Sequence, residues 1–170
     1  MKSKAATSHF MISSVAKADP AALLELTNAL QPLRRAWIQA ASLVLTDFGL
    51  PNSLASALIL ASRHGPDGVR QNALAEEVGV NPGAMVRILD QGESAGLLER
   101  RDSTEDRRIK TIHVLPEGKD LARQMEEAIA RLRSQLLSDL PAGDIQTTTR
   151  LLRQFENRIG AFLQQERANR

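Results

Sequence analysis

The chain has 170 residues, of which 42% are hydrophobic, and 22 Lys plus Arg against 20 Asp plus Glu give a formal net charge of +2. A chain of this size can bury one hydrophobic core, and no Pro/Gly/Ser-rich linker divides it, so we expect a single domain over residues 20–170. The small net charge means that any affinity for a polyanion depends on where the cations cluster.

The composition excludes or disfavours several kinds of site. The chain has no Cys, which rules out disulfides, thiolate metal sites and thiol-based sensing of oxidants. His9, His64 and His113 are far apart and show no ligand spacing such as H-x-x-x-H, so we expect no metal site. A P-loop, a G-x-G-x-x-G motif and a nucleophile elbow are all missing, and we therefore expect neither a cofactor nor an enzyme activity.

The N-terminal segment and the apolar runs predict a soluble, cytoplasmic protein. Polar residues between Thr7 and Ser14 interrupt what would be the apolar core of a signal peptide. The longest apolar runs, 40–45 and 54–61, are much shorter than the roughly 20 residues that cross a bilayer, so we expect no membrane partner. Residues 1–19 show no periodicity and are predicted to form a mobile arm.

Hydrophobic periodicity predicts a long first helix that starts at Pro20. It would end before Gly49 and Pro51, and a second, shorter helix would cover residues 53–64 before a Gly-Pro-Asp-Gly turn at 65–68. The apolar stripe of the first helix recurs at three- and four-residue steps and consists of Leu23, Leu26, Leu30, Leu33, Trp37, Ala40 and Val44.

The next stretch has the spacing of a helix-turn-helix, with helices over 70–78 and from Pro82 to about Ala95. Ala75 is small enough for two helices to cross closely, and Gly79 tolerates a positive φ in the turn. Val80 supplies an apolar plug, Asn81 a helix cap, and Pro82 occupies the first helical position. Met85, Ile88 and Leu89 would then point inward, and Gly83, Ala84, Val86, Arg87 and Gln91 would lie on or near the outer face.

A β-hairpin and two long helices are predicted after the helix-turn-helix. Residues 97–101 and 109–115 are strand candidates around a polar turn at 102–106. One helix would run from Glu117 to about Leu140, and Asp144 would cap the last helix after a break at Pro141 and Gly143. The apolar face of the last helix consists of Ile145, Thr148, Leu152, Phe155, Ile159 and Phe162. The predicted fold class is mainly α with a small β-hairpin wing, a winged helix-turn-helix over 53–115.

The long amphipathic helices at 20–48 and 117–170 cannot all fold onto a small winged core. Apolar surface is therefore left for a partner, and a second copy of the chain is the simplest one. We predict that these helices mediate homodimerisation.

The hairpin is a candidate DNA-binding element together with the helix that precedes it. Residues 100–110 hold five cations against three acids, a local surplus of two positive charges. A narrow basic hairpin is suited to a minor groove while the preceding helix lies in the major groove. The alternatives are an ordinary helix pair joined by a tight turn and a solvated hairpin tip.

The stretch from Leu74 to Gly118 resembles the MarR family of bacterial regulators. The resemblance is strongest at Gly-Leu-Leu-Glu-Arg-Arg-Asp-Ser-Thr-Glu-Asp-Arg-Arg (96–108) and at Leu-Pro-Glu-Gly (115–118). The flanking helices fit that architecture in number and order. The resemblance implies a winged helix-turn-helix with N- and C-terminal dimerisation helices, which presents two recognition helices and two wings to a near-palindromic operator in double-stranded DNA.

The resemblance also implies roles for individual residues. Arg87 would contact DNA, with Ala84 and Val86 beside it near thymine methyl groups. Asp106 and Arg108 would brace the wing by an ion pair, and Arg107 or Arg108 would reach the minor groove. The predicted DNA-binding residues are Asn81, Gly83, Ala84, Val86, Arg87, Arg107 and Arg108.

In addition to DNA binding, the resemblance implies a small-molecule effector. Many relatives are released from DNA by small aromatic or phenolic acids, so we predict a repressor with a small anionic or aromatic ligand. An activator is the alternative, because the sign of regulation depends on where the operator lies relative to a promoter. The candidate residues for the ligand are Arg34, Trp37 and His64, with Arg35 and Arg63 nearby in sequence; a core Trp, solvated Arg side chains and a surface His are the alternatives. The competing function is a winged-helix protein–protein interaction module without specific DNA binding.

Three positions depart from the family pattern. Gly92 stands where a large aliphatic residue is usual, so a neighbour fills the space, the helix bends, or the recognition helix is softened. Leu115 stands where a capping Thr is common, which predicts a weak cap. Gly83 in the first turn of the recognition helix either allows close approach to a phosphate or is merely tolerated.

Overall fold

A computed structural model describes residues 19–103 and 109–169 of the chain. The predicted N-terminal arm, apart from Asp19, lies outside the described residues, as does the hairpin tip at 104–108. The chain divides into two compact units, one up to Ala40 and one from Ala41 onward, and we describe each by itself.

The first unit contains most of helix α1 (Pro20–Leu45). The helix begins after Asp19, whose carboxylate accepts a hydrogen bond from the Ala21 N–H at 3.3 Å. Its apolar side chains are largely exposed, including Leu23 at 52% and Leu33 at 63%. The predicted apolar stripe therefore has little cover within this unit.

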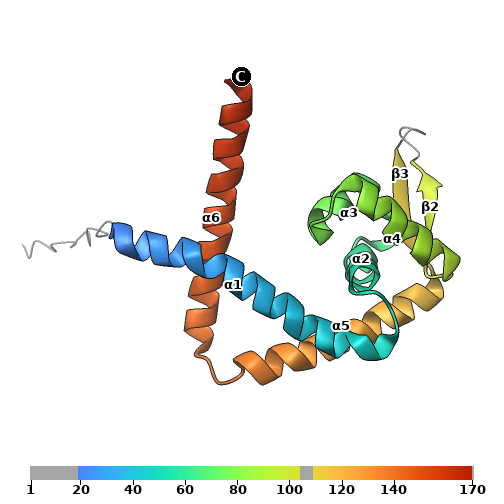
Figure 1. Cartoon of the computed structure of the whole chain (residues 1–170), viewed down its shortest axis with the longest axis horizontal. Helices are drawn as coiled ribbons and strands as arrows, with labels where there is room; N and C mark the ends of the chain where they lie inside the picture. The colour runs from blue at the N-terminus through green and yellow to red at the C-terminus, as the bar shows by residue number, and fades with distance from the viewer. Residues whose placement is uncertain (1–18, 104–108, 170) are drawn as a thin grey trace, which may run out of the picture. The chain divides into compact units, whose positions relative to one another are not determined.

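The second unit contains every further helix that the sequence predicts, in the predicted order (Figure 1). The elements are η1 (Thr46–Phe48), α2 (Asn52–Ser62), η2 (Gly65–Asp67), β1 (Val69–Arg70), α3 (Gln71–Val78), α4 (Pro82–Ser94), β2 (Leu98–Asp102), β3 (Lys110–Val114), α5 (Pro116–Leu137) and α6 (Ala142–Ala168).

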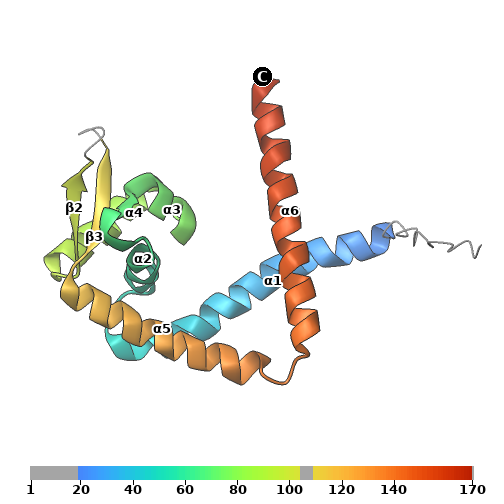
Figure 2. The same cartoon turned by 180° about the vertical axis from the view of Figure 1, so that it is seen from behind.

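Helix α2 forms the centre of this unit. It lies between α5 on one side and the α3–α4 pair on the other (Figures 1 and 2). Its apolar side chains are buried on both sides, which fits a helix that is hydrophobic around most of its circumference. The largest fully buried side chains come from α2 itself and from α3, α4, β2, β3 and α5 around it: Leu54, Leu58, Leu74, Met85, Leu89, Leu98, Ile112 and Met125.

The wing, by which we mean strands β2 and β3, is part of a three-stranded antiparallel sheet in the order β1-β3-β2. Leu98 of β2 pairs with Val114 of β3, and Val69 of β1 pairs with Ile112 on the other side of β3. Periodicity in the sequence predicts only the hairpin formed by β2 and β3. It misses β1 because a two-residue strand carries no periodicity.

Two glycines allow close packing around the wing. A Cβ on Gly92 would lie 2.8 Å from both Cγ and Cδ2 of Leu98, so a neighbouring side chain fills the space that the sequence leaves open, and α4 continues through it. A Cβ on Gly118 would overlap the carbonyl oxygen of Leu97, which accepts the Leu115 N–H at 3.0 Å. Leu115 gives α5 no side-chain cap, as predicted.

The predicted start of the last helix is wrong in its detail. Pro141, not Asp144, occupies the N-cap position of α6, and Asp144 lies in the first helical turn, where an acid still interacts favourably with the helix dipole. None of the described residues of α6 is buried.

Within the described residues, no single helix is both long and apolar enough to cross a membrane; only a bent pair, Pro20–Phe48 with Asn52–Ser62, passes on length and composition when its two parts are counted together.

Candidate nucleic-acid interface

The turn between α3 and α4 has the predicted geometry. Gly79 is left-handed, with φ 79° and ψ 38°, and its N–H donates to the carbonyl of Ala75 at 2.9 Å. The Val80 N–H donates to the same oxygen at 3.0 Å, and Ala75 is buried at the crossing. These contacts end α3 and direct the chain into α4, as a helix-turn-helix requires.

The start of α4 is fixed by a side-chain cap. The Asn81 Oδ1 accepts the Ala84 N–H at 2.8 Å, and Pro82 follows in the first turn. The capping prediction is therefore confirmed. A DNA contact from Asn81 stays a prediction; its side-chain oxygen is engaged in the cap, whereas its amide nitrogen makes no hydrogen bond to the described residues.

Helix α4 has a buried face and an exposed face. Met85, Ile88, Leu89 and Gly92 are buried, which confirms the predicted inward positions. Gly83, Val86, Arg87 and Gln91 are exposed, and Ala84 is partly exposed. The predicted recognition residues therefore share one accessible surface.

Arg87 is the cation on this surface. It forms no hydrogen bond or ion pair with any residue that the structure describes, although acids lie on the same helix. An exposed guanidinium without a protein partner keeps its donors available for a guanine edge or a phosphate.

The described cations of the wing are, by contrast, all paired with acids. Arg101 Nε donates to Glu99 at 2.6 Å within β2, and Lys110 pairs with Asp102 across the hairpin. The predicted positive surplus is therefore not supplied by these side chains. Asp106, Arg107 and Arg108, predicted to brace the wing and reach the minor groove, lie outside the described residues.

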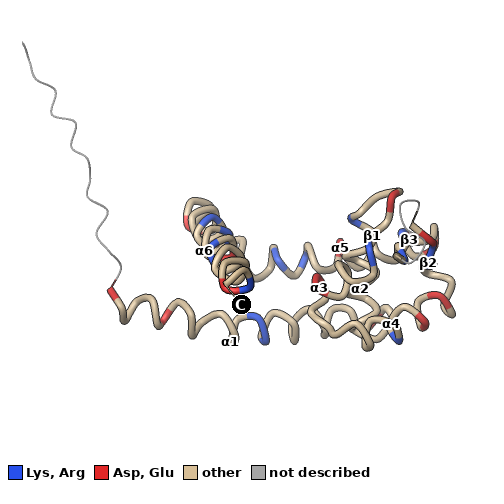
Figure 3. The backbone as a smooth tube through the Cα atoms, turned by 90° about the horizontal axis from the view of Figure 1, so that it is seen from above, with Lys and Arg blue, Asp and Glu red and all other residues tan. Residues whose placement is uncertain are grey.

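Arg100 pairs in a different way, which charge counting along the sequence missed. Its guanidinium leaves the wing and contacts Asp90 and Glu93 of α4. Figure 3 shows acidic positions, in red, toward the end of α4 that leads to β2. The sequence signal was the spacing of Asp90 and Glu93, which places two acids on one face of the predicted helix.

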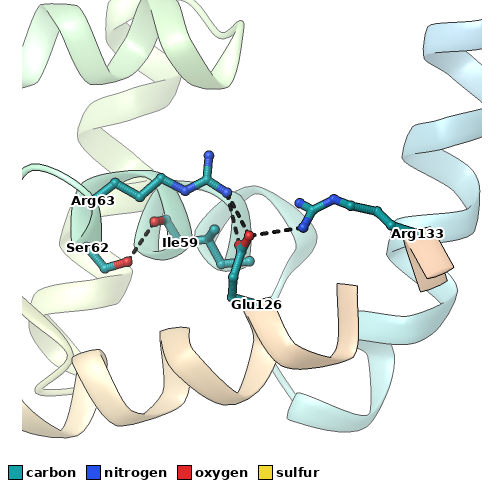
Figure 4. Close-up of polar contacts among 5 residues, drawn as sticks. All are labelled: Ile59, Ser62, Arg63, Glu126 and Arg133. Carbon is teal, nitrogen blue, oxygen red and sulfur yellow. Dashed lines mark hydrogen bonds and ion pairs between the residues drawn. The ribbon is translucent and has the colours of Figure 1, made fainter. Parts of the chain in front are cut away.

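A second polar cluster joins α2 to α5. Arg63 Nη2 donates to both carboxylate oxygens of Glu126, at 2.9 and 3.1 Å, and Arg133 Nη1 donates to Oε1 at 3.2 Å (Figure 4). Partial burial alone would raise the pKa of Glu126, but the hydrogen bonds and charges of the two arginines outweigh it and lower that pKa. The adjacent His64 contacts α3 instead, with its Nε2 2.9 Å from Glu77 Oε1.

The predicted ligand residues fall in both units. Arg34 and Arg35 are exposed and Trp37 is partly buried on α1, in the first unit. His64 and Arg63 belong to the second unit, and both already have acidic partners. A cleft of about 460 Å³ beside Arg63 is lined by α2 and α5 residues that include Lys119, Ala122, Glu126 and Ala130. No group of metal-binding side chains occurs among the described residues.

Comparison with known proteins agrees with this geometry. Residues 50–110, which include α2, α3, α4 and β2, match the model of the MarR family. The solved structure of the transcriptional regulator PA3341 is 27% identical, with a TM-score of 0.73, over 79% of this chain and 98% of its own.

Two further structures share the fold at lower identity. CouR from Rhodococcus jostii RHA1, solved with p-coumaroyl-CoA, is 23% identical with a TM-score of 0.68, over 81% of this chain and 95% of its own. MepR from S. aureus, solved with DNA, is 19% identical with a TM-score of 0.63, over 83% of this chain and 98% of its own. Residues 50–110 of the winged helix-turn-helix described above are therefore similar to the MarR family, and the solved structures that share the fold include MarR-family transcriptional regulators.

Proposed function

We propose that this regulator binds a specific duplex DNA sequence in the cytoplasm, as a homodimer, and catalyses no reaction. The observation that carries the proposal is the exposed face of α4, where Arg87 has no partner among the described residues and small side chains surround it. Recognition helices read base edges from such a face, with an Arg on guanine and apolar groups on thymine methyls.

The start of α4 favours close approach to DNA. Gly83 is exposed, and a Cβ there would meet only its own chain's Asn81 Oδ1 at 3.5 Å, an ordinary contact. The protein itself therefore does not require a glycine at this position. A phosphate near the helix N-terminus would explain one, because backbone N–H groups and the helix dipole attract anions there. MepR, which shares the fold, was solved with DNA, and this supports a DNA-binding role here.

Dimerisation is supported by apolar surface that one chain leaves uncovered. Helix α6 has 27 residues, and none of those described is buried. Even its apolar side chains are open to solvent, with Ile159 44% and Phe162 61% exposed. A long helix with an apolar face needs tertiary or quaternary packing to be stable in water. Two copies would present two α4 helices to half-sites about 10 base pairs apart, hence a near-palindromic operator.

We further propose that the protein is a repressor released by a small anionic or aromatic ligand. CouR, of the same fold, was solved with p-coumaroyl-CoA. In this chain Arg34 and Trp37 remain candidates, and the cleft beside Arg63 has the volume of a small-molecule site. His64 is the weakest candidate, since its ring nitrogen already contacts Glu77.

The test starts with selection of bound duplexes from a random pool by the full chain. Affinity for the selected duplex would then be measured by fluorescence anisotropy over a salt series. We expect a specific complex that weakens steeply with salt, and Arg87→Ala should cost about tenfold or more in affinity. Arg150→Ala on α6, which removes another exposed and unpaired Arg among the described residues, is the matched control. A wild-type protein that enriches no sequence, or binds with no salt dependence, would favour a protein-interaction module instead.

A further inference from the structure

Arg100 connects the wing to the proposed recognition helix through acceptors spread over almost two turns of α4. Its Nη2 donates to the Val86 carbonyl at 2.9 Å and to Asp90 Oδ1 at 2.5 Å. Its Nη1 lies 3.2 Å from Glu93 Oε2, and its backbone N–H donates to Glu93 Oε1 at 2.7 Å. Because Val86, Asp90 and Glu93 follow one another at helical spacing, one guanidinium spans almost two turns of α4.

This arrangement differs from the other ion pairs of the wing. The Arg100 side chain is 22% exposed, whereas those of Arg101 and Lys110 are 57% and 51% exposed. Arg101 and Lys110 contact acids within the wing itself, so their pairs do not connect the wing to α4. Exposed pairs of that kind contribute little, while a half-buried fork that contacts a carbonyl and two carboxylates fixes a geometry.

The guanidinium of Arg100 is held in a position that leaves one of its N–H donors, Nε, without an acceptor among the described residues. Its Nε is buried and has no hydrogen-bond partner in the described part of the chain. A guanidinium free to move would turn this N–H toward water, because an unpaired buried donor is unfavourable. The contacts to α4 therefore determine the position of the side chain.

The position of these contacts matters for DNA binding. Val86, whose carbonyl Arg100 holds, precedes Arg87, and both are exposed on the proposed recognition surface. The same side chain sets where β2 lies against α4. One residue thus contacts both elements of the proposed DNA-binding surface.

We propose that Arg100 is a positioning residue for DNA reading, which holds the wing and α4 in the single relative orientation that lets both approach one operator half-site. The proposal rests on the proposed function and adds to it a residue that contacts no DNA. Neither its charge alone nor its contribution to stability accounts for the role.

The first experiment compares Arg100→Gln with Arg101→Gln, which removes the same charge from the next residue of the same strand. Binding to the selected duplex is measured on folded dimers, well below the melting temperature of each variant. We expect Arg100→Gln to weaken binding about tenfold and Arg101→Gln to change it less than about threefold. Equal losses in the two variants would overturn the proposal.

The second experiment separates positioning from charge and from stability. In Arg100→Gln/Asp90→Asn/Glu93→Gln the cation and both acids are removed together, and we expect binding to stay weak; wild-type affinity there would overturn the proposal. Arg87→Ala is then introduced into the Arg100→Gln background. The loss of DNA affinity caused by Arg87→Ala should shrink from about tenfold in the wild-type background to less than about threefold in the Arg100→Gln background. The reason is that Arg87 no longer approaches its base correctly once Arg100 is replaced.

An undiminished Arg87 effect would show that Arg100 only stabilises the fold, and would also overturn the proposal. Failure of the proposed function looks different, because the wild-type chain would then bind no duplex at all.

Discussion

Gly92 of α4 and Leu98 of β2 share one packing site, in which the Leu98 side chain occupies the space where a Cβ at position 92 would stand. The distances are 2.8 Å to Leu98 Cγ and Cδ2 and 3.1 Å to Leu54 Cδ1, all shorter than normal Cβ contacts. Both leucines are fully buried, so neither can turn away into solvent. The glycine is therefore required by the packing of the wing on α4.

Gly92→Ala should destabilise the protein even though Ala is the better helix former. The gain in helix propensity is about 1 kcal/mol, but overpacking in a dense core costs about 1–3 kcal/mol. We expect a net loss in the free energy of unfolding, measured by urea titration at one protein concentration. Gly83→Ala in the same helix is the control, since a Cβ there meets only an ordinary contact. An increase in stability for Gly92→Ala would contradict the shared packing site.

Gly83→Ala should separate stability from DNA binding. The substitution is expected to raise the free energy of unfolding by up to about 1 kcal/mol, because Ala loses less backbone entropy in a helix. If a phosphate approaches the backbone at this turn, the added methyl group lowers affinity for the selected duplex at the same time. Urea titration and fluorescence anisotropy on one preparation test both effects. Unchanged affinity would mean that the glycine is merely tolerated.

Glu126→Gln should lower stability in a pH-dependent way. Arg63 and Arg133 lower the pKa of Glu126 below its ordinary value of 4.5. The stabilising contribution of this carboxylate is therefore fully present above pH 4.5 and is lost as the pH falls through the lower pKa of the folded state. We expect the stability difference between wild type and Glu126→Gln, about 0.5–1 kcal/mol at neutral pH, to shrink below pH 4.5.

Glu127→Gln is the matched control for this measurement. Glu127 is the next residue and pairs with Arg123 one turn away on the exposed surface of α5, at 2.8 Å. Glu127→Gln should lower the free energy of unfolding less than Glu126→Gln does. A difference for Glu126→Gln that does not depend on pH would show that its charge is not responsible.

Phe162→Asp should weaken the proposed dimer. The ring is 61% exposed in the single chain, and a carboxylate buried against a second copy would carry a desolvation penalty. Sedimentation equilibrium should show a dimer dissociation constant at least about tenfold higher than that of wild type. Asn157→Asp, which adds a charge on another side of α6, is the control. Identical association of Phe162→Asp and wild type would place the interface elsewhere.

Local signals made the helix-turn-helix predictable. Gly79 and Asn81 act through hydrogen bonds to residues no more than four positions away, at Ala75 and Ala84, so their roles are contained in a short stretch of sequence. The inward residues of α4 were equally accessible, because helical periodicity alone separates them from the outer face.

Long-range contacts account for what sequence reasoning missed. Strand β1 exists because Val69 pairs with Ile112, more than forty positions away. Counting charges placed Arg100 on an exposed basic tip, whereas its partners Asp90 and Glu93 come from a different element. The sequence allows a filled space, a bent helix or a softened helix at Gly92, and the long-range contact with Leu98 decides for the filled space.

Two consecutive residues at the end of α2 form side-chain contacts with different helices. Arg63 is bonded to Glu126 of α5, and His64 is bonded to Glu77 of α3, the helix that leads into the DNA-reading turn. The end of α2 is thus tied at adjacent positions to two helices, one from the C-terminal part of the chain and one from the helix-turn-helix.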